Sequence, residues 1–297
     1  MRAVDCVERV DLGEVPYEDA VRDMADWVAR RRAGEIPDRL ALLSHPPVIT
    51  YGSRTPPAEL PAGLTVPLVP VDRGGQATFH GPGQLIGYLV LNLRERGPGD
   101  IVRRVENGLI AACADLGFET VRRDTPPGAQ SLVGVWTPDG RKLVSIGMRI
   151  RGGVTSHGFA LNITSDLVEF TRFVACGLPG VAMTSLAELA AEQGRPAPAE
   201  QEVRDAVARA LGARQAAVCP MSKSGRHGSP WPGRSTTPGP GGVMKLGKAL
   251  ATGVAEERPQ THDEELELAD EIRGIEPPAS ESASKSESES EEVPAAR

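Results

Sequence analysis

Apolar residues spaced like one face of a helix predict two long helices in the first half of the chain. The first begins at Pro16 and ends near Gly34, and its apolar face consists of Val21, Met24, Ala25 and Val28. The second has Asp100 as its N-cap and ends at Gly117, and its apolar face consists of Val102, Val105, Leu109, Ile110 and Cys113. We expect both helices to cover a sheet.

Apolar and alternating runs predict strands between and after these helices. The runs lie at residues 39–44, 47–52, 66–71, 85–93, 131–136, 142–151 and 154–163, and two further helices are expected after Thr184 and Pro198. Because the strands arrive in neighbouring runs with short turns, a mixed, largely antiparallel sheet is favoured over a doubly wound parallel one. The predicted fold class is α/β (α+β), with helices flanking the sheet.

The composition changes after residue 219. Residues 1–219 hold 24 Lys and Arg against 26 Asp and Glu, whereas residues 220–297 hold 9 against 14 and are rich in Gly, Pro and Ser. Such a tail cannot bury enough apolar surface to offset its chain entropy. We therefore predict a folded domain over 1–219 and an acidic tail over 220–297 without a fixed fold, apart from a short helix near 262–273. The tail would serve as a solubilising appendage or as a partner-binding segment.

Several absences indicate the setting of the protein. No apolar run approaches the ~20 residues of a membrane span, and the N-terminal residues lack the apolar core of a secretory signal. Four cysteines (Cys6, Cys113, Cys176 and Cys219) include no CxxC pair, which favours free thiols in a reducing compartment. The nearly neutral domain lacks the basic face that nucleic-acid binding needs. We expect a soluble, cytoplasmic protein.

The segment from Arg73 to Gln84, RGGQATFHGPGQ, has the composition of a ligand-facing loop. It packs four glycines and one proline between two predicted strands. Glycine allows a backbone to approach a ligand closely or to adopt positive φ, at an entropic cost that ordinary surface loops seldom repeat so densely.

Lys142 is the one lysine among residues 1–219, a span with 23 arginines. Arginine keeps its proton at neutral pH whereas lysine can release it, so a lysine retained in such a chain is a candidate general base. In the predicted strand it shares a face with Val144, Ile146 and Met148, and apolar surroundings favour the neutral amine. The alternative is a strand-end lysine whose ammonium reaches water.

Of the cysteines, Cys176 stands in the setting of a nucleophile. It precedes Gly177 in a Gly- and Pro-rich loop, where a thiol is accessible and neighbouring N–H groups could receive an oxyanion. The alternative is a plain loop cysteine. Cys113 lies on the apolar face of a predicted helix and is expected to pack in the core.

Five segments of the chain form a combined pattern. They are Arg73–Tyr88 (RGGQATFHGPGQLIGY), Gly134–Trp136 (GVW), Lys142 with the following Ser145-Ile146-Gly147, His157–Asn162 (HGFALN) and Cys176–Leu178 (CGL). In order and spacing they resemble the lipoyl(octanoyl) transferase family over about residues 5–215. The chain departs from that family at Phe79, where tyrosine is usual, and at Leu89, where proline is common. Neither difference removes a reactive group.

This resemblance implies a fold similar to the catalytic domain of biotin and lipoate protein ligases and an acyltransferase activity over residues 1–219 that needs no cofactor. The donor would be octanoyl-acyl carrier protein, and the acceptor a lysine on a lipoyl domain of a 2-oxoacid dehydrogenase complex or on a glycine-cleavage H protein. Cys176 would carry the acyl group as a thioester, and Lys142 would favour its thiolate and relay protons. The implied substrate-binding residues are Arg73, Gly74, Gly75, Gln76, Ala77, Thr78, Phe79, His80, Ser145, Ile146, Gly147, Gly158, Phe159 and Ala160.

Other hypotheses stay open at this point. An ATP-dependent lipoate or biotin ligase would share the fold, but it would activate the acid as an adenylate and need no cysteine nucleophile. A non-catalytic module could bind acyl carriers or lipoyl domains as a scaffold. His80 and His157 each precede a glycine and serve either the acyl site or the packing. A zinc hydrolase would require a third ligand, which neither His45 nor His227 convincingly supplies.

Overall fold

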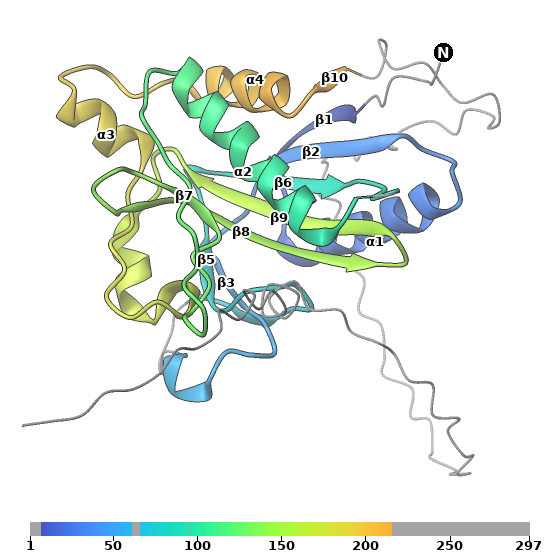
Figure 1. The fold of residues 1–297 in the computed structure, drawn as a ribbon, viewed down its shortest axis with the longest axis horizontal. Helices are drawn as coiled ribbons and strands as arrows, with labels where there is room; N and C mark the ends of the chain where they lie inside the picture. The colour runs from blue at the N-terminus through green and yellow to red at the C-terminus, as the bar shows by residue number, and fades with distance from the viewer. Residues whose placement is uncertain (1–6, 61–65, 95, 216–297) are drawn as a thin grey trace, which may run out of the picture.

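The computed structural model of the protein describes residues 7–60, 66–94 and 96–215 (Figure 1). Its helices are α1 (Tyr17–Arg32), α2 (Pro98–Asp115), α3 (Leu186–Glu192) and α4 (Glu200–Ala210), and its short 3-10 turns are η1 (Pro57–Glu59), η2 (Leu167–Arg172) and η3 (Ala175–Gly177). Its strands are β1 (Val7–Glu14), β2 (Asp38–Ser44), β3 (Val48–Tyr51), β4 (Leu68–Pro70), β5 (Thr78–His80), β6 (Gln84–Val90), β7 (Gly134–Trp136), β8 (Lys142–Arg151), β9 (Val154–Asn162) and β10 (Ala213–Gln215). Cys6, Cys219, the boundary at residue 219 and the predicted tail lie outside the described residues.

Seven strands of the described ranges form the main sheet, in the order β10-β1-β2-β6-β9-β8-β7. The pairs β10–β1 and β1–β2 are parallel, and the four pairs from β2 to β7 are antiparallel. The prediction of a mixed, largely antiparallel sheet is confirmed. All residues of β6 are buried because it lies in the middle of the sheet, covered on both faces.

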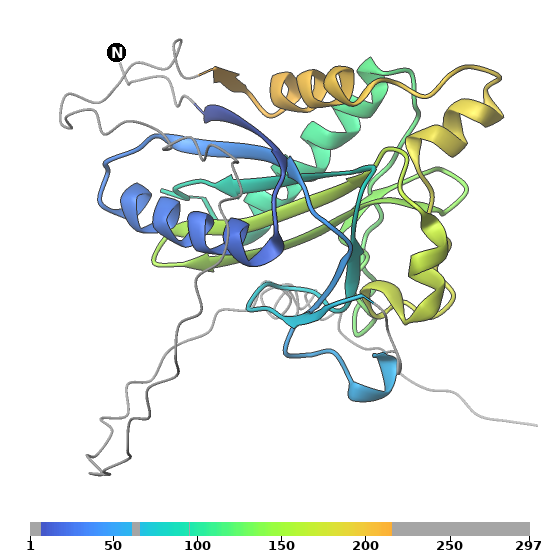
Figure 2. The same ribbon diagram turned by 180° about the vertical axis from the view of Figure 1, so that it is seen from behind.

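Helices cover the two faces of this sheet (Figures 1 and 2). On one face, α1 packs against β6 and β9, and Ala20 and Met24 belong to the same apolar cluster as Ile86. On the other face, α2 and α4 pack against each other over the apolar side of β8 and β9. Ala25, which the spacing assigned to the buried face of α1, is exposed, because that face is centred on Tyr17, Ala20 and Met24.

A bent two-stranded ribbon leads from the main sheet to a small second sheet. β2 pairs antiparallel with β6 in the main sheet, and their neighbours along the chain, β3 and β5, pair antiparallel in the small sheet of order β4-β3-β5. The ribbon changes sheets at residues 45–47 and 81–83. His45 and His80 lie beside this bend, with ring centroids 5.9 Å apart.

The start of α2 differs from the sequence prediction. The N-cap is Gly97 and the helix begins at Pro98, because proline has no N–H to leave unsatisfied in the first turn. Asp100 is the third residue of the helix, and its carboxylate accepts a 3.2 Å hydrogen bond from the N–H of Gly97. The side chain therefore stabilises the N-terminus of α2 from inside the helix, as in a capping box.

Some predicted strands are shorter than expected and three were missed. The run at 66–71 forms a strand only at Leu68–Pro70, and the run at 131–136 only at Gly134–Trp136. β1 and β10 were not predicted, and β5 lies within the segment that was expected to be a loop. In the described ranges, none of the helices combines the length and the apolar character needed to cross a bilayer.

Candidate functional site

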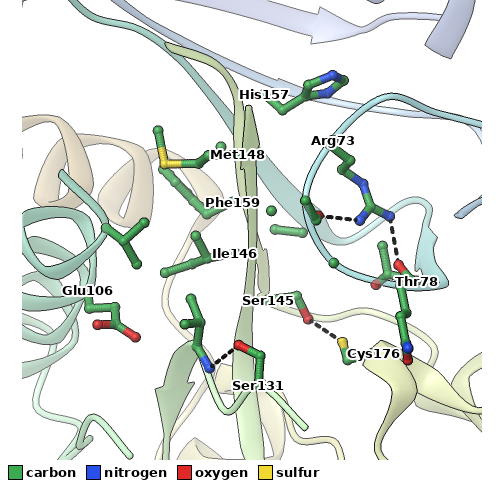
Figure 3. A pocket seen from close by; sticks show the side chains of 18 of the residues that line it. Arg73, Thr78, Glu106, Ser131, Ser145, Ile146, Met148, His157, Phe159 and Cys176 are labelled. Carbon is green, nitrogen blue, oxygen red and sulfur yellow. Dashed lines mark hydrogen bonds between the residues drawn. The ribbon is translucent and has the colours of Figure 1, made fainter. Parts of the chain in front are cut away.

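A cavity of about 280 Å³ lies against β8 and β9. Segments far apart in the chain line it: α1, the Gly-rich segment, β6, α2, β8, β9 and η3. Figure 3 shows Glu106, Ile146 and Phe159 on one side of the strand ribbon and Arg73 and Cys176 on the other. Every predicted site residue lines this cavity except Ala77 and Phe79.

Cys176 sits in η3 with a left-handed backbone, φ 58° and ψ 18°. Such a conformation costs a non-glycine residue roughly 1–3 kcal/mol and is retained where the surroundings enforce it. Here the enforcing contact is a 2.7 Å hydrogen bond from the Cys176 N–H to the carbonyl of Ala77. The thiol sulfur, which is partly exposed, lies 3.4 Å from the hydroxyl oxygen of Ser145 on β8.

The backbone N–H groups around Cys176 are engaged within the protein. Those of Cys176, Gly177 and Leu178 donate to the carbonyls of Ala77, Val174 and Ala175. The expectation that N–H groups beside Cys176 receive an oxyanion is therefore wrong for these three, because each already has an acceptor. The hydroxyl of Ser145 lies within hydrogen-bonding distance of the thiol sulfur.

Lys142 begins β8 and is only 2% exposed, so its ammonium does not reach water in the way a surface lysine would. Its Nζ donates to the carbonyl of Val133 at 3.2 Å and lies 4.9 Å from the ring centroid of Trp136. Between the described side chains of Lys142 and Cys176 there is no direct hydrogen bond. Both nonetheless line the same cavity.

The loop that carries Cys176 is attached to the backbone of Lys142. The Lys142 N–H donates to Ala182, and the Lys142 carbonyl accepts from the N–H of Thr184, at 2.8 and 3.0 Å. This short parallel bridge fixes the segment after η3 along the start of β8. Cys176 lies in the loop just before this bridge, so its loop is attached to the strand that carries Lys142, 34 positions earlier in the sequence.

Arg73 holds the Gly-rich segment in shape. Its guanidinium donates to the carbonyls of Thr50, Gly74 and Gln76 and to the hydroxyl of Thr50. The segment lies directly on β8. The approach is so close that a Cβ at Gly147 would lie only 3.2 Å from the Arg73 side chain. Most N–H groups of the Arg73 guanidinium therefore donate hydrogen bonds within the protein, and the residue fixes the shape of the cavity wall.

His80 is part of a buried chain of hydrogen bonds in which every proton position follows from its neighbours. Gln84 donates through Nε2 to Phe79 and Asn162, so its oxygen must accept from Nδ1 of His80, 2.8 Å away. Burial, together with His45 and Arg73, lowers the pKa of His80 to about 3, and the ring is neutral. Its Nε2 therefore accepts from the hydroxyl of Thr50 at 3.2 Å.

This chain continues to the loop behind Cys176. Asn162 donates to the carbonyl of Thr184 at 3.0 Å, and Thr184 donates to the carbonyl of Lys142. Each residue of the chain donates a hydrogen bond to the next one, in the direction from the Gly-rich segment toward β8. His80 has no free nitrogen for acid–base chemistry in this arrangement, which favours the hydrogen-bonding role over that of a base.

His157 lies on the far side of the cavity from Cys176 (Figure 3). Burial, with Arg73 and Arg149 nearby, lowers its pKa to about 3, so the neutral ring donates through Nε2 to the carboxylate of Asp72 at 3.2 Å. Like Cys176 it has positive φ, 58°. His45 bonds to Val15 and to Tyr88. These contacts make both rings part of the packing around the cavity.

Two predicted residues act from behind the cavity wall. Ala77 is fully buried and contributes the carbonyl that holds Cys176. The ring of Phe79 packs edge-on against Phe170 in a separate apolar cluster. Both were assigned to the substrate because they lie inside a contiguous motif, but alternate residues of a strand point to opposite faces.

The sequence prediction missed several residues of the site. Glu106 lines the cavity from α2, where it is a lone acid in a stripe of apolar residues. Gln84 and Asn162 lie inside recognised motifs but were not assigned a role. Tyr17 lines the cavity from α1, and burial raises its pKa to about 12.

Comparisons with known proteins point to one family. The model of the lipoyl protein ligase A/B catalytic domain matches residues 19–212. A Frankia casuarinae octanoyltransferase is 45% identical over 196 residues, which is 65% of this chain and 89% of the relative. An Acidothermus cellulolyticus octanoyltransferase is 50% identical over 182 residues, 59% of this chain and 78% of the relative.

Solved structures share the fold at low identity. A lipoate-protein ligase A bound with ATP superposes with a TM-score of 0.54 and 15% identity, covering 71% of this chain and 88% of the other. A putative lipoate protein ligase from T. acidophilum with bound lipoic acid gives 0.53 and 15%, covering 69% and 84%. The predicted likeness to lipoate protein ligases is confirmed at the level of the fold.

Proposed function

The chain belongs to the lipoyl protein ligase A/B catalytic domain family, and on this premise we propose that it is an acyltransferase that moves an octanoyl group onto lysines of lipoyl domains. The names of its relatives, octanoyltransferases at 45% and 50% identity, support this activity. The donor is octanoyl-acyl carrier protein. The acceptors are lipoyl domains of 2-oxoacid dehydrogenase complexes and the glycine-cleavage H protein. The catalytic domain spans residues 1–219, and the reaction takes place in the cytoplasm.

The observation that carries the proposal is the convergence on one cavity of a partly exposed thiol and a buried lysine. Cys176 and Lys142 line the same 280 Å³ space, and the loop of the first is hydrogen-bonded to the backbone of the second. The two other acyl-site candidates, His80 and His157, are neutral and bonded to partners. A thiol beside an amine base is the arrangement that nucleophilic acyl transfer requires.

In the first step, Lys142 as a free amine accepts the proton of Cys176, and the thiolate attacks the thioester carbonyl of the donor. In this structure Nζ of Lys142 instead donates to the carbonyl of Val133, so the step requires the lysine side chain to leave that carbonyl and turn toward the thiol. The carbon–sulfur bond to the carrier breaks, and the leaving thiolate takes the proton back from Lys142. The octanoyl group remains on Cys176 as a thioester.

The hydroxyl of Ser145 is the candidate donor to the oxyanion that forms during this attack. It lies 3.4 Å from the sulfur, so a carbonyl carbon bonded to that sulfur would carry its oxygen within reach of the hydroxyl. The N–H groups of residues 176–178 are already engaged. The walls that would contact the substrate are formed by Arg73 to His80, except Ala77 and Phe79, together with Ser145 to Gly147 and Gly158 to Ala160.

In the second step, the amine of an acceptor lysine attacks the Cys176 thioester. An amide bond forms, the Cys176 thiolate leaves, and the proton lost by the amine passes through Lys142. Exchange between two thioesters is nearly isoenergetic and the amide is more stable than either, so the sequence of steps needs no ATP.

Intact-mass spectrometry of the protein mixed with octanoyl-acyl carrier protein tests the proposal. We expect a gain of one octanoyl group on the wild type, loss of that gain with Cys176→Ala, and its transfer to an added lipoyl domain without ATP. Full turnover by Cys176→Ala would contradict the nucleophile. Loading of free octanoate only with ATP would assign the protein to the ligases, and binding without any mass gain would make it a scaffold.

A further inference from the structure

A single peptide group stands between Lys142 and the carboxylate of Glu106. The carbonyl of Val133 accepts from Nζ of Lys142 at 3.2 Å, and the N–H of the next residue, Gly134, donates to Oε1 of Glu106 at 3.0 Å. Carbonyl and N–H belong to the same amide, which therefore carries the ammonium on one end and the carboxylate on the other. Its dipole is oriented favourably toward both charges.

Glu106 is buried although it carries a carboxyl group. It is 3% exposed in the middle of α2, and burial raises its pKa above the usual range. The other carboxylate in the cavity lining, Asp124, is exposed and pairs with Arg122 at 2.9 Å. A buried carboxyl group needs a partner to offset its lost hydration, and the partner that the chain provides is the peptide 133–134.

Lys142 has the complementary requirement. Its charge is buried, and its contacts among the described residues are a carbonyl and the ring of Trp136, neither of which carries a full negative charge. Arg123 lies 5.1 Å from the same ring and adds a positive charge nearby. Glu106 is the buried carboxyl group of the cavity lining, and it is connected to Lys142 through the Val133–Gly134 peptide.

Gly134 makes this arrangement possible. It has φ 142°, and a Cβ there would lie 3.0 Å from Cε of Lys142. The glycine thus lets the lysine side chain run against the backbone that bridges it to Glu106. A Cβ at this position would also lie 2.4 Å from the carbonyl oxygen of Val144, so a side chain there would shift the backbone against which the lysine packs.

We propose that Glu106 is a positioning residue for the acyl-transfer reaction, which holds Lys142 and biases its protonation through the Val133–Gly134 peptide. This inference rests on the proposed function and names a further residue for the same site. Glu106 faces Arg103 on its own helix and Arg122 and Asp124 from the following segment, and its connection to Lys142 runs through the Val133–Gly134 peptide. Lys142 in turn faces Trp136 from β7, and it lines the same cavity as Cys176 from η3.

The sign of the effect follows from the charges. An ionised Glu106 favours the ammonium form of Lys142, so removal of its charge makes the free amine available at lower pH. It also removes from the cavity a negative charge that disfavours the thiolate form of Cys176. Both effects move the onset of Cys176 reactivity toward lower pH.

Glu106→Gln is the discriminating variant, because the amide oxygen can still accept from Gly134 while the charge is lost. We expect the midpoint of the pH profile for Cys176 alkylation by iodoacetamide, followed across about pH 6 to 9 by peptide-resolved mass spectrometry, to fall by about 0.5 to 1 unit. A direct charge contact would give about 1–3 units, and the intervening peptide weakens it. Glu106→Asp, which keeps the carboxylate, should restore the profile in part.

Asp115→Asn is the matched control, since it removes an exposed carboxylate from the same helix, away from the cavity. It should leave the midpoint where the wild type has it. If Glu106→Gln folds and its alkylation midpoint coincides with that of the wild type, the inference is wrong, even where turnover falls. Failure of the wild type to acquire an octanoyl group would overturn the proposed function instead, and the alkylation profile would still report on Glu106.

Discussion

The side-chain amide of Gln76 occupies the space in which a Cβ at Gly177 would lie. Gly177 also has φ +66°, a conformation that favours glycine. One residue along each segment, the N–H of Cys176 donates to the carbonyl of Ala77. The Gly-rich segment and the Cys176 turn are therefore interlocked, and the position of the thiol depends on both.

Gly177→Ala should misplace this turn. We expect acylation of Cys176 to slow by about a hundredfold, because a displacement of about 1 Å is enough for such a loss. Gly180→Ala is the matched control: it has φ +71° in the same loop but open space around it, so it should cost only roughly 1–2 kcal/mol of folding free energy. Single-turnover mass spectrometry and urea unfolding measure the two effects. Equal acylation rates in the two variants would rule out the interlock.

Gln84→Glu should break the chain of hydrogen bonds between His80 and Asn162. The introduced carboxylate would have no proton to donate to Phe79 or Asn162, and we expect a loss of about 1–3 kcal/mol in the free energy of unfolding. Its negative charge facing Nδ1 should also raise the pKa of His80 from about 3, which NMR titration of the ring would detect. Gln193→Glu, an exposed change, is the control. An unshifted His80 titration would argue against the assigned proton positions.

The stability of the protein should fall as the pH drops below about 6.5. His80 and His157 have pKa values of about 3 in the folded chain against 6.5 when unperturbed, so in this interval the unfolded chain binds more protons. Each histidine contributes a slope of up to about 1.4 kcal/mol per pH unit, with stability rising as the pH rises. Urea unfolding at several pH values should give a smaller slope for His80→Gln, by about one proton. Identical slopes would contradict the buried neutral ring.

Phe159 should limit the length of the acyl chain. Its ring lines the cavity and lies so close to Gly87 that a Cβ there would overlap it. Phe159→Leu should enlarge the cavity and favour decanoyl over octanoyl thioesters, at a cost of roughly 1–2 kcal/mol in stability. Gly87→Ala should push the ring inward and favour hexanoyl. The measurement is the relative rate of Cys176 acylation by hexanoyl, octanoyl and decanoyl thioesters. If both variants shifted the preferred chain length in the same direction, this role of Phe159 would be excluded.

Periodicity in the sequence was enough to predict the elements that form the centre of the fold. The alternation of Val144, Ile146 and Met148 gave β8, and the helical spacing around Met24 gave α1, since these elements bury one face in the core. β1 was missed because half of its sequence, VERVDLGE, is charged and because only its first residue is fully buried. β10 has three residues, too few for any pattern.

For the site, the motifs predicted which residues gather around the cavity but not how they are bonded. Gln84 and Asn162 are 78 positions apart, and their hydrogen bond follows from the antiparallel pairing of β6 and β9. Glu106 has no motif around it, and its connection to Lys142 passes through a backbone amide. Contacts of this kind depend on register and helix placement, which a single sequence does not specify.

The pairing of β10 with β1 joins residues near the two ends of the described domain, as in the contact of Val7 with Ala213. During synthesis on a ribosome, β1 would emerge early and wait for a partner strand that is made more than two hundred residues later. Contacts of such high sequence separation slow folding, because the intervening loop must close before they form. The nascent chain would therefore expose one edge of β1 until translation of the domain is complete.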